Sequence, residues 1–234
     1  MYGYYGYYMD WTYILVLIGA IFSIMASAKV NSTFNKYQRV RSMTGMTGAE
    51  AAEKILNQNG IYDVDIQHIK GNLTDHYDPR TKVLRLSDAT YGSNSVAAIG
   101  VAAHECGHAL QHKEEYFPLK FRSAIVPAAN IGSRLGIPIV ILGMIMGQNY
   151  LLIQIGIWVF SLAVLFQIVT LPVEFNASSR AMRMLEQYGI LGSDEIGKTR
   201  KVLSAAAMTY VAAAAASVLQ LLRLILLGGR RNRD

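Results

Sequence analysis

Residues 95 to 115 read SVAAIGVAAHECGHALQHKEE, and this stretch decides how the chain can fold. Its small and apolar first half predicts a helix that continues through the histidines. His104 and His108 stand four residues apart, so they share one face of that helix, and Glu105 follows the first histidine directly. This H-E-x-x-H pattern is typical of two histidines that bind one zinc ion, with the glutamate as a general base. The stretch therefore predicts a metal-binding helix.

A third histidine continues the series but cannot reach the same metal. His112 comes eight residues after His104, by which point a helix has turned by about 80° and risen by about 12 Å. A metzincin would need glycine at 111 and histidine at 114, where this chain has Gln111 and Glu114. A third ligand must therefore come from another segment. Cys106 lies away from the histidine face, which favours a small buried filler over a regulatory thiolate on the metal.

The sequence before the motif is that of a small α+β domain. Thr47 is expected to cap a helix over residues 48–60, and Ser93 or Ser95 to cap the helix of the histidines. Two alternating segments between them, residues 61–69 and KVLRLSD at 82–88, predict strands. KVLRLSD is either an edge strand that binds an extended peptide by β-augmentation or a core strand, and periodicity does not separate the two.

The composition around this domain is that of a membrane protein. Hydrophobic residues make up 52% of the chain and charged residues only 16%, and the mean hydropathy is +0.25. Residues 11–28 are predicted to be a transmembrane signal anchor, because this apolar run is long enough to cross a bilayer. Basic residues follow the run and only Asp10 precedes it, so the α+β domain at 29–122 is expected in the cytoplasm. The tyrosine-rich residues 1–10 are either an interfacial aromatic anchor or a tail without a role.

The chain becomes apolar again after the domain. Residues 123–171 predict a transmembrane hairpin, followed by a polar region at 172–201 whose helix is expected to begin at Pro172. Residues 202–227 predict a C-terminal apolar helix. This helix either spans the membrane, which puts its basic end outside, or is re-entrant or lies against the domain.

The hairpin points to the third ligand. The chain returns to the side of the histidines only after Leu171, and Glu174 is the first acid that follows. Glu174 is therefore the candidate ligand, and a solvated carboxylate at the membrane boundary is the alternative. The competing acids, which lie farther from that boundary, are Glu186, Asp194 and Glu195.

Together these features resemble the neutral zinc membrane peptidases of the YugP family. The resemblance rests on H-E-C-G-H at 104–108, KVLRLSD before it, GNLTDHYDP at 71–79, and E-F-N-A-S-S-R-A from 174 after the hairpin. More distantly the chain is similar to the HtpX and CAAX prenyl peptidases. The resemblance implies a mainly α integral membrane protein, multi-pass in the cell membrane, with transmembrane helices and a small α+β, gluzincin-like metallopeptidase domain.

The resemblance also implies a set of site residues. His104, His108 and Glu174 would hold one Zn²⁺ per chain, and Glu105 would be the general base. The acid that HtpX-like peptidases carry four residues after the third ligand is Ser178 here, whose hydroxyl could still accept a histidine N–H. Candidates for stabilising the oxyanion, each of which could instead be structural, are Tyr210, His76, Tyr91 and Arg223.

The expected function is hydrolysis of peptide bonds in protein or peptide substrates, presumed membrane-associated, by a zinc-activated water at the cytoplasmic face. The alternative is a catalytically silent metal-binding scaffold that binds a partner protein or a second copy of itself. A site-two-type intramembrane protease is disfavoured, because no aspartate occurs between Asp88 and Asp194. Nucleic-acid binding is not expected despite the net charge of +6, because the basic residues lie near the ends of apolar runs.

Overall fold

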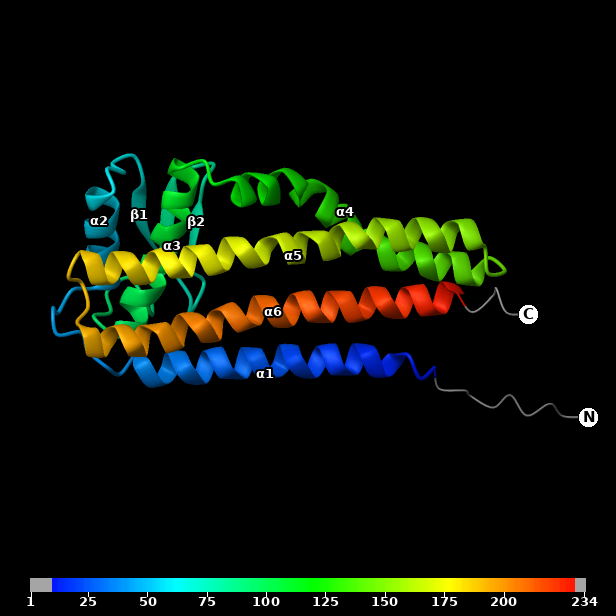
Figure 1. Ribbon diagram of the computed structural model, residues 1–234, viewed down its shortest axis with the longest axis horizontal. Helices are drawn as coiled ribbons and strands as arrows, with labels where there is room; N and C mark the ends of the chain where they lie inside the picture. Colours follow the sequence, from blue (N-terminus) through cyan, green and yellow to red (C-terminus); the bar gives the residue numbers. More distant parts are fainter. Residues whose placement is uncertain (1–9, 230–234) are drawn as a thin grey trace, which may run out of the picture.

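The computed structural model describes residues 10–229, so the tyrosine-rich tip at 1–9 and the basic tail at 230–234 lie outside it. Long helices run side by side, and the small α+β domain sits at one end of them (Figure 1). The helices are α1 (Tyr13–Tyr37), α2 (Gly48–Gln58), α3 (Val96–Lys113), α4 (Phe117–Ile145), α5 (Tyr150–Gln187) and α6 (Ser193–Gly229). The strands are β1 (Asp65–Ile69), β2 (His76–Asp78) and β3 (Val83–Ser87).

Four of the described helices, α1, α4, α5 and α6, are long and apolar enough to cross a membrane. Their outward-facing side chains are apolar: Leu17 is 59% exposed, Met25 61% and Trp158 71%. Side chains of this kind, exposed along whole helices, suit a lipid environment and not water. The chain is therefore a mainly α membrane protein with a small α+β domain, as the sequence predicts.

The two last helices are longer than predicted at their polar ends. Pro172 lies inside α5, so the expectation that a helix begins there is wrong. α5 continues through it because neighbouring helices in an apolar bundle favour keeping the remaining backbone hydrogen bonds. α6 begins at Ser193, and its first turns bury Ile196 and Thr199 against the domain. Each helix therefore belongs partly to the bundle and partly to the domain.

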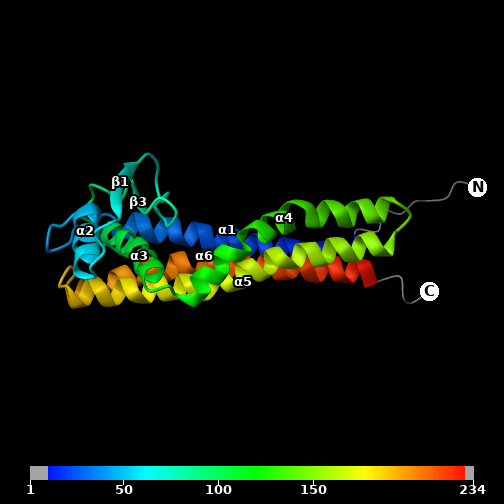
Figure 2. The ribbon, with the colours of Figure 1, turned by 90° about the horizontal axis from the view of Figure 1, so that it is seen from above.

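The C-terminal helix follows the full length of the bundle. α6 runs antiparallel to α1 and ends where α1 begins, at the end of the bundle away from the domain (Figures 1 and 2). The sequence left open whether this helix spans or lies against the domain; α6 packs along α1 over the length of the bundle and is long and apolar enough to cross a membrane. The α4–α5 hairpin turns at the same distant end.

The central strand of the sheet is β3. It pairs in parallel with β1 and antiparallel with β2, which gives the strand order β1-β3-β2. Leu84 and Leu86 on β3 are fully buried. The edge-strand interpretation of KVLRLSD is therefore wrong, because both edges of that strand are paired. β1 and β2 are the two edge strands of the sheet, and β2, with three residues and no alternating pattern, was too short a segment to predict.

Helix caps place α2 and α3 as predicted. Thr47 and Glu50 form a capping box at the start of α2, in which each side chain accepts the backbone N–H of the other residue. Ser95 caps α3 by accepting the N–H of Ala98 at 3.2 Å. The core of the domain forms between these two helices and the adjoining ends of α5 and α6, with Ile55, Ile99 and other fully buried side chains.

Gly107 lies within the H-E-x-x-H motif, directly before His108, and its lack of a side chain lets α3 approach α5 closely. A Cβ on Gly107 would lie 2.6 Å from the carbonyl oxygen of Ala177, a backbone atom that cannot move away alone. Gly107→Ala should therefore push the helices apart and destabilise the protein by about 1–3 kcal/mol. Thermal unfolding in detergent measures this. Gly197→Ala on α6, where a Cβ meets nothing within 4 Å, is the matched control and should be neutral or stabilising. Equal stability of the two variants would contradict the close-approach argument.

Candidate metal centre

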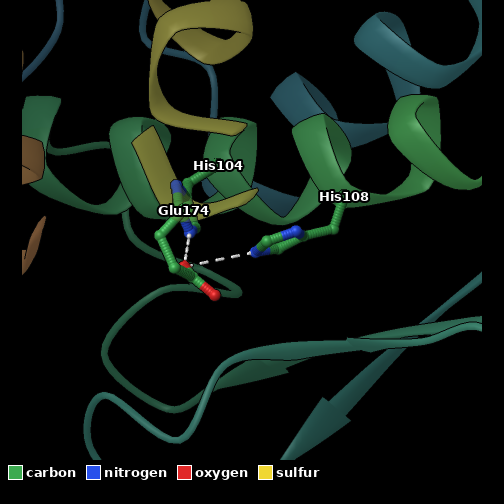
Figure 3. A group of neighbouring side chains, drawn as sticks. All are labelled: His104, His108 and Glu174. Carbon is green, nitrogen blue, oxygen red and sulfur yellow. Dashed lines mark ion pairs between the residues drawn. The ribbon is translucent and has the colours of Figure 1, made fainter. Parts of the chain in front are cut away.

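Two elements that are far apart in the sequence supply the candidate ligands. α3 presents His104 and His108, and α5 presents Glu174, whose carboxylate faces both imidazoles (Figure 3). The Oε2 atom of Glu174 lies 3.3 Å from Nε2 of His104 and 3.5 Å from Nε2 of His108. Within the described chain these three residues form a group whose ligand atoms lie within 4.8 Å of one another. The structure thus brings together the residues that the sequence singled out.

The spacing and chemistry of these atoms fit zinc. Ligand bonds of about 2.0–2.2 Å in a tetrahedral site put neighbouring ligand atoms roughly 3.3 Å apart, which matches the separations of Glu174 from both histidines. Glu174 Oε2 is buried and has no hydrogen-bond partner within residues 10–229, a costly state for a carboxylate oxygen unless a cation lies beside it. Two imidazole nitrogens and one carboxylate oxygen are a donor set typical of catalytic zinc.

Hydrogen bonds orient both imidazoles toward that point. The Nδ1 atom of His108 lies 3.0 Å from Oε1 of Gln111, and the amide nitrogen of Gln111 donates to the carbonyl oxygen of Val173 and to Asn176. Gln111 Oε1 is therefore an acceptor, so His108 carries its proton on Nδ1 and presents an unprotonated Nε2 to a metal. Burial alone would lower the pKa of His108, but the carboxylates of Glu174 and Glu105 outweigh it and raise that pKa.

His104 has an equivalent partner on α5. Its Nδ1 atom lies 3.1 Å from the hydroxyl oxygen of Ser178. HtpX-like peptidases carry an acid at the position of Ser178. In this structure the Ser178 hydroxyl lies within hydrogen-bonding distance of the His104 imidazole. A neutral hydroxyl accepts this N–H less strongly than a carboxylate, so the His104 ring is oriented but gains less basicity.

Removing that hydroxyl should weaken zinc binding. Ser178→Ala leaves the Nδ1–H of His104 without its acceptor, and loss of such an outer partner lowers metal affinity by roughly 10–100-fold. Competition with a chromophoric zinc chelator measures the affinity. The neighbouring Ser179, an exposed serine on the same helix, is the control: Ser179→Ala should bind zinc like the unchanged protein. Equal affinities of the two variants would remove Ser178 from the site.

Glu105 lies in the narrow space between α3 and the edge strand. It is 8% exposed, and its Oε2 atom accepts the backbone N–H of Tyr77 on β2 at 2.9 Å. Because that N–H points toward α3, it is turned away from β3 and belongs to the free edge of the sheet. The carboxylate is thus held beside the ligand histidines without being one of the three grouped ligands.

Two further polar side chains lie beside Glu174. Tyr210 on α6 interacts electrostatically with the carboxylates of Glu174 and Glu105, so this oxyanion candidate lies near the ligands. Arg122 on α4 places Nη1 3.8 Å from Glu174 Oε1, with its guanidinium 5.7 Å from the ring of Phe166. Sequence reasoning missed Arg122, because a basic residue before an apolar run is equally well explained by membrane orientation.

The other oxyanion candidates lie elsewhere. Arg223 is at the far end of α6, where it pairs with Asp10 at 3.6 Å and stacks on the ring of Tyr13, so its suggested role is wrong. The ion-pair partner of this charge in an apolar helix lies near the start of the chain, at the end of the bundle away from the domain, which the sequence could not show. Tyr91 packs against His68 on the sheet. His76 is exposed on β2 and contacts the Thr74 carbonyl, and its role stays a prediction.

Residues that the sequence set aside are indeed placed outside the ligand group. His112 contacts the hydroxyl of Tyr77 at 2.9 Å. Cys106 is buried, its thiol directed at the carbonyl of Ala52, and burial raises its pKa, which suits an inert filler. Glu195 accepts backbone N–H groups of Met43 and Gly192 near the start of α6. The remaining competing acids, exposed on α5 and α6, are Glu186 and Asp194.

Comparison with known proteins agrees with this geometry. A family model described as "Putative neutral zinc metallopeptidase" matches residues 12–228. The chain belongs to this family. It is also 48% identical over 221 residues to "Putative membrane protease YugP" of Bacillus subtilis (strain 168), covering 93% of this chain and 98% of that protein. No solved structure matches. The family match spans the bundle and the domain together, from α1 to the end of α6.

Proposed function

We propose that the protein is a membrane-embedded zinc endopeptidase with its active site at the cytoplasmic face. The observation that carries this proposal is the group of His104, His108 and the buried Glu174, with the Glu105 carboxylate held against the outer edge of β2. A site that only stored a metal would not need an acid beside the ligands, facing an edge where a peptide can enter.

The residues around the site divide the work of peptide hydrolysis. Zinc bound by the three ligands would lower the pKa of a coordinated water and polarise the scissile carbonyl. Glu105 accepts a proton from the attacking water and delivers it to the leaving amine nitrogen. Tyr210 and Arg122, which both interact with Glu174, are the candidate donors to the negative charge that develops on the substrate oxygen.

The edge strand supports binding of an extended substrate. The outer edge of β2 faces the same space as Glu105, whose carboxylate accepts the N–H of Tyr77 on that edge. A peptide pairing with β2 by main-chain hydrogen bonds would lie across the ligands. We therefore transfer the β-augmentation role, which the sequence suggested for KVLRLSD, to β2.

The position of the site favours membrane-associated substrates. The ligand helix α3 leads directly into α4 (Figure 2), and Glu174 lies on α5 just after the apolar run that ends at Leu171. The basic residues after the apolar part of α1 support a cytoplasmic position for this end of the bundle. Peptide segments close to the cytoplasmic surface of the membrane would reach the site most directly.

Peptide turnover by the purified protein tests the proposal. Protein in detergent or nanodiscs should cleave casein or a fluorogenic peptide library, o-phenanthroline should abolish cleavage, and added zinc should restore it. The scaffold alternative predicts bound zinc without turnover of any peptide. Stoichiometric zinc with no cleavage across the library would therefore contradict the peptidase proposal.

A further inference from the structure

A basic hollow lies between α1 and α6, next to the α+β domain. It has a volume of about 720 Å³ and opens where the two helices lie side by side (Figures 1 and 2). No carboxylate lines it, and its hydroxyl groups come from serine, threonine and tyrosine. The charged residues that line it are Lys29, Lys36, Arg200 and Lys201.

Helix geometry makes these charges converge. Lys29 and Lys36 are two turns apart and therefore share a face of α1. A Cβ on Gly19 would lie 3.0 Å from Ala216 Cα, which sets the register of the two antiparallel helices. In that register Lys36 lies at the level of Arg200 and Lys201, so cations from both helices face one space.

These four cations lack counter-charges. None of them forms an ion pair with another residue in the described part of the chain, whereas Arg180 pairs with Glu114 and Lys120 with Glu115. Four like charges around one hollow repel one another, and the resulting positive potential favours an anion between them.

The hollow lies at the boundary of the apolar surface. On α1 the exposed Met25 lies one turn before Lys29, and on α6 an apolar stretch begins directly after Lys201. The phosphate groups of a bilayer lie at this kind of boundary, with acyl chains on its apolar side. Met208, half-exposed at the inner rim of the hollow, offers apolar contact there.

Gly197 keeps the hollow open. It lies within α6, where glycine costs about 0.5–1 kcal/mol relative to alanine. A Cβ at this position would meet nothing within 4 Å, so close packing does not require the glycine. The absence of a side chain instead leaves room in the lining of the hollow.

We propose that this hollow binds the phosphate headgroup of an anionic phospholipid from the leaflet on the domain's side. Lys29, Lys36, Arg200 and Lys201 neutralise the phosphate, and the hydroxyl of Ser204 donates to it. The acyl chains lie along the exposed apolar surface of α1. This site is separate from the metal centre and does not depend on the proposed peptidase activity.

Lipid retention tests the proposal. Full-length protein is reconstituted in phosphatidylcholine nanodiscs with phosphatidylglycerol as a minor component, extracted, and examined by native mass spectrometry. We expect phosphatidylglycerol to be retained in preference to phosphatidylcholine. The double variant Arg200→Gln and Lys201→Gln should weaken this retention roughly tenfold or more, because each cation near a membrane surface contributes appreciably to binding anionic lipid. Equal retention of both lipids by the unchanged protein would overturn the proposal.

Two further variants separate a built site from general surface charge. Arg183→Gln with Lys198→Gln removes the same charge from residues that do not line the hollow, and it should retain the lipid. Gly197→Leu fills the hollow without changing charge and should lose the lipid. Loss in the first variant, or retention in the second, would overturn the proposal. Inorganic phosphate at millimolar concentration should not displace the lipid; displacement would identify a free-phosphate site instead.

Discussion

Glu105→Gln should abolish peptide cleavage and leave zinc bound. Glutamine keeps the size of the side chain, and its amide oxygen can still accept the N–H of Tyr77, so the space between α3 and β2 keeps its shape. It cannot accept a proton from water at neutral pH, and loss of general acid–base catalysis lowers the rate by about 10²–10⁴-fold. Cleavage of a fluorogenic peptide gives kcat/KM, and elemental analysis of the purified protein gives the zinc content.

The control for this variant is an exposed glutamate in the same domain. Glu53 lies on α2 with its side chain in solvent, so Glu53→Gln should cleave and bind zinc like the unchanged protein. Full activity of the Glu105→Gln protein would exclude Glu105 as the general base. Loss of zinc together with activity would instead mean that Glu105 helps to hold the metal.

Glu174→Gln should lower zinc affinity by more than about 100-fold, beyond the effect of losing an outer partner. The Oε2 atom of Glu174 is the atom that lies beside both histidine nitrogens, so it is the third ligand atom of the group. An amide in its place is a neutral and weaker donor, and two imidazoles alone do not complete a catalytic zinc site. Competition with a zinc chelator measures the affinity, and activity should fall in parallel.

Glu186 on the same helix provides the matched control for Glu174. It is an exposed acid twelve residues along α5 and was a competing candidate for the third ligand. Glu186→Gln should therefore bind zinc normally. If Glu186→Gln lost zinc and Glu174→Gln kept it, the assignment of the ligands would be wrong.

Local rules predicted the parts of the fold that depend on neighbouring residues. The four-residue spacing of His104 and His108 puts both on one helix face whatever the rest of the chain does. Thr47 was predicted as a cap, and Ser95 as one of two candidate caps with Ser93, because such hydroxyls reach N–H groups only a few residues away. The exclusion of His112 from the ligand group follows from helix rotation alone.

Long-range packing decided the parts of the site that sequence spacing cannot show. The amide of Gln111, seen in the sequence only as a departure from the metzincin pattern, orients His108 because it is held by Val173 on α5. Packing puts Arg122 beside Glu174, whereas Arg223 lies at the far end of the bundle. β2 is the edge strand that faces Glu105, although its three residues show no hydrophobic alternation from which a strand could be predicted.

The sequence by itself determined that this is a membrane protein, that one helix carries two histidines on a shared face with a glutamate beside the first of them, and that a hairpin precedes Glu174. Only the tertiary structure decided how these residues meet, through the close approach of α3 and α5 that Gly107 permits. The physical reason is the distance along the chain over which each signal carries information. Composition and helical periodicity describe a few turns of chain, whereas a metal centre needs atoms from separate helices within a few ångströms. That distance is set by packing across the whole bundle.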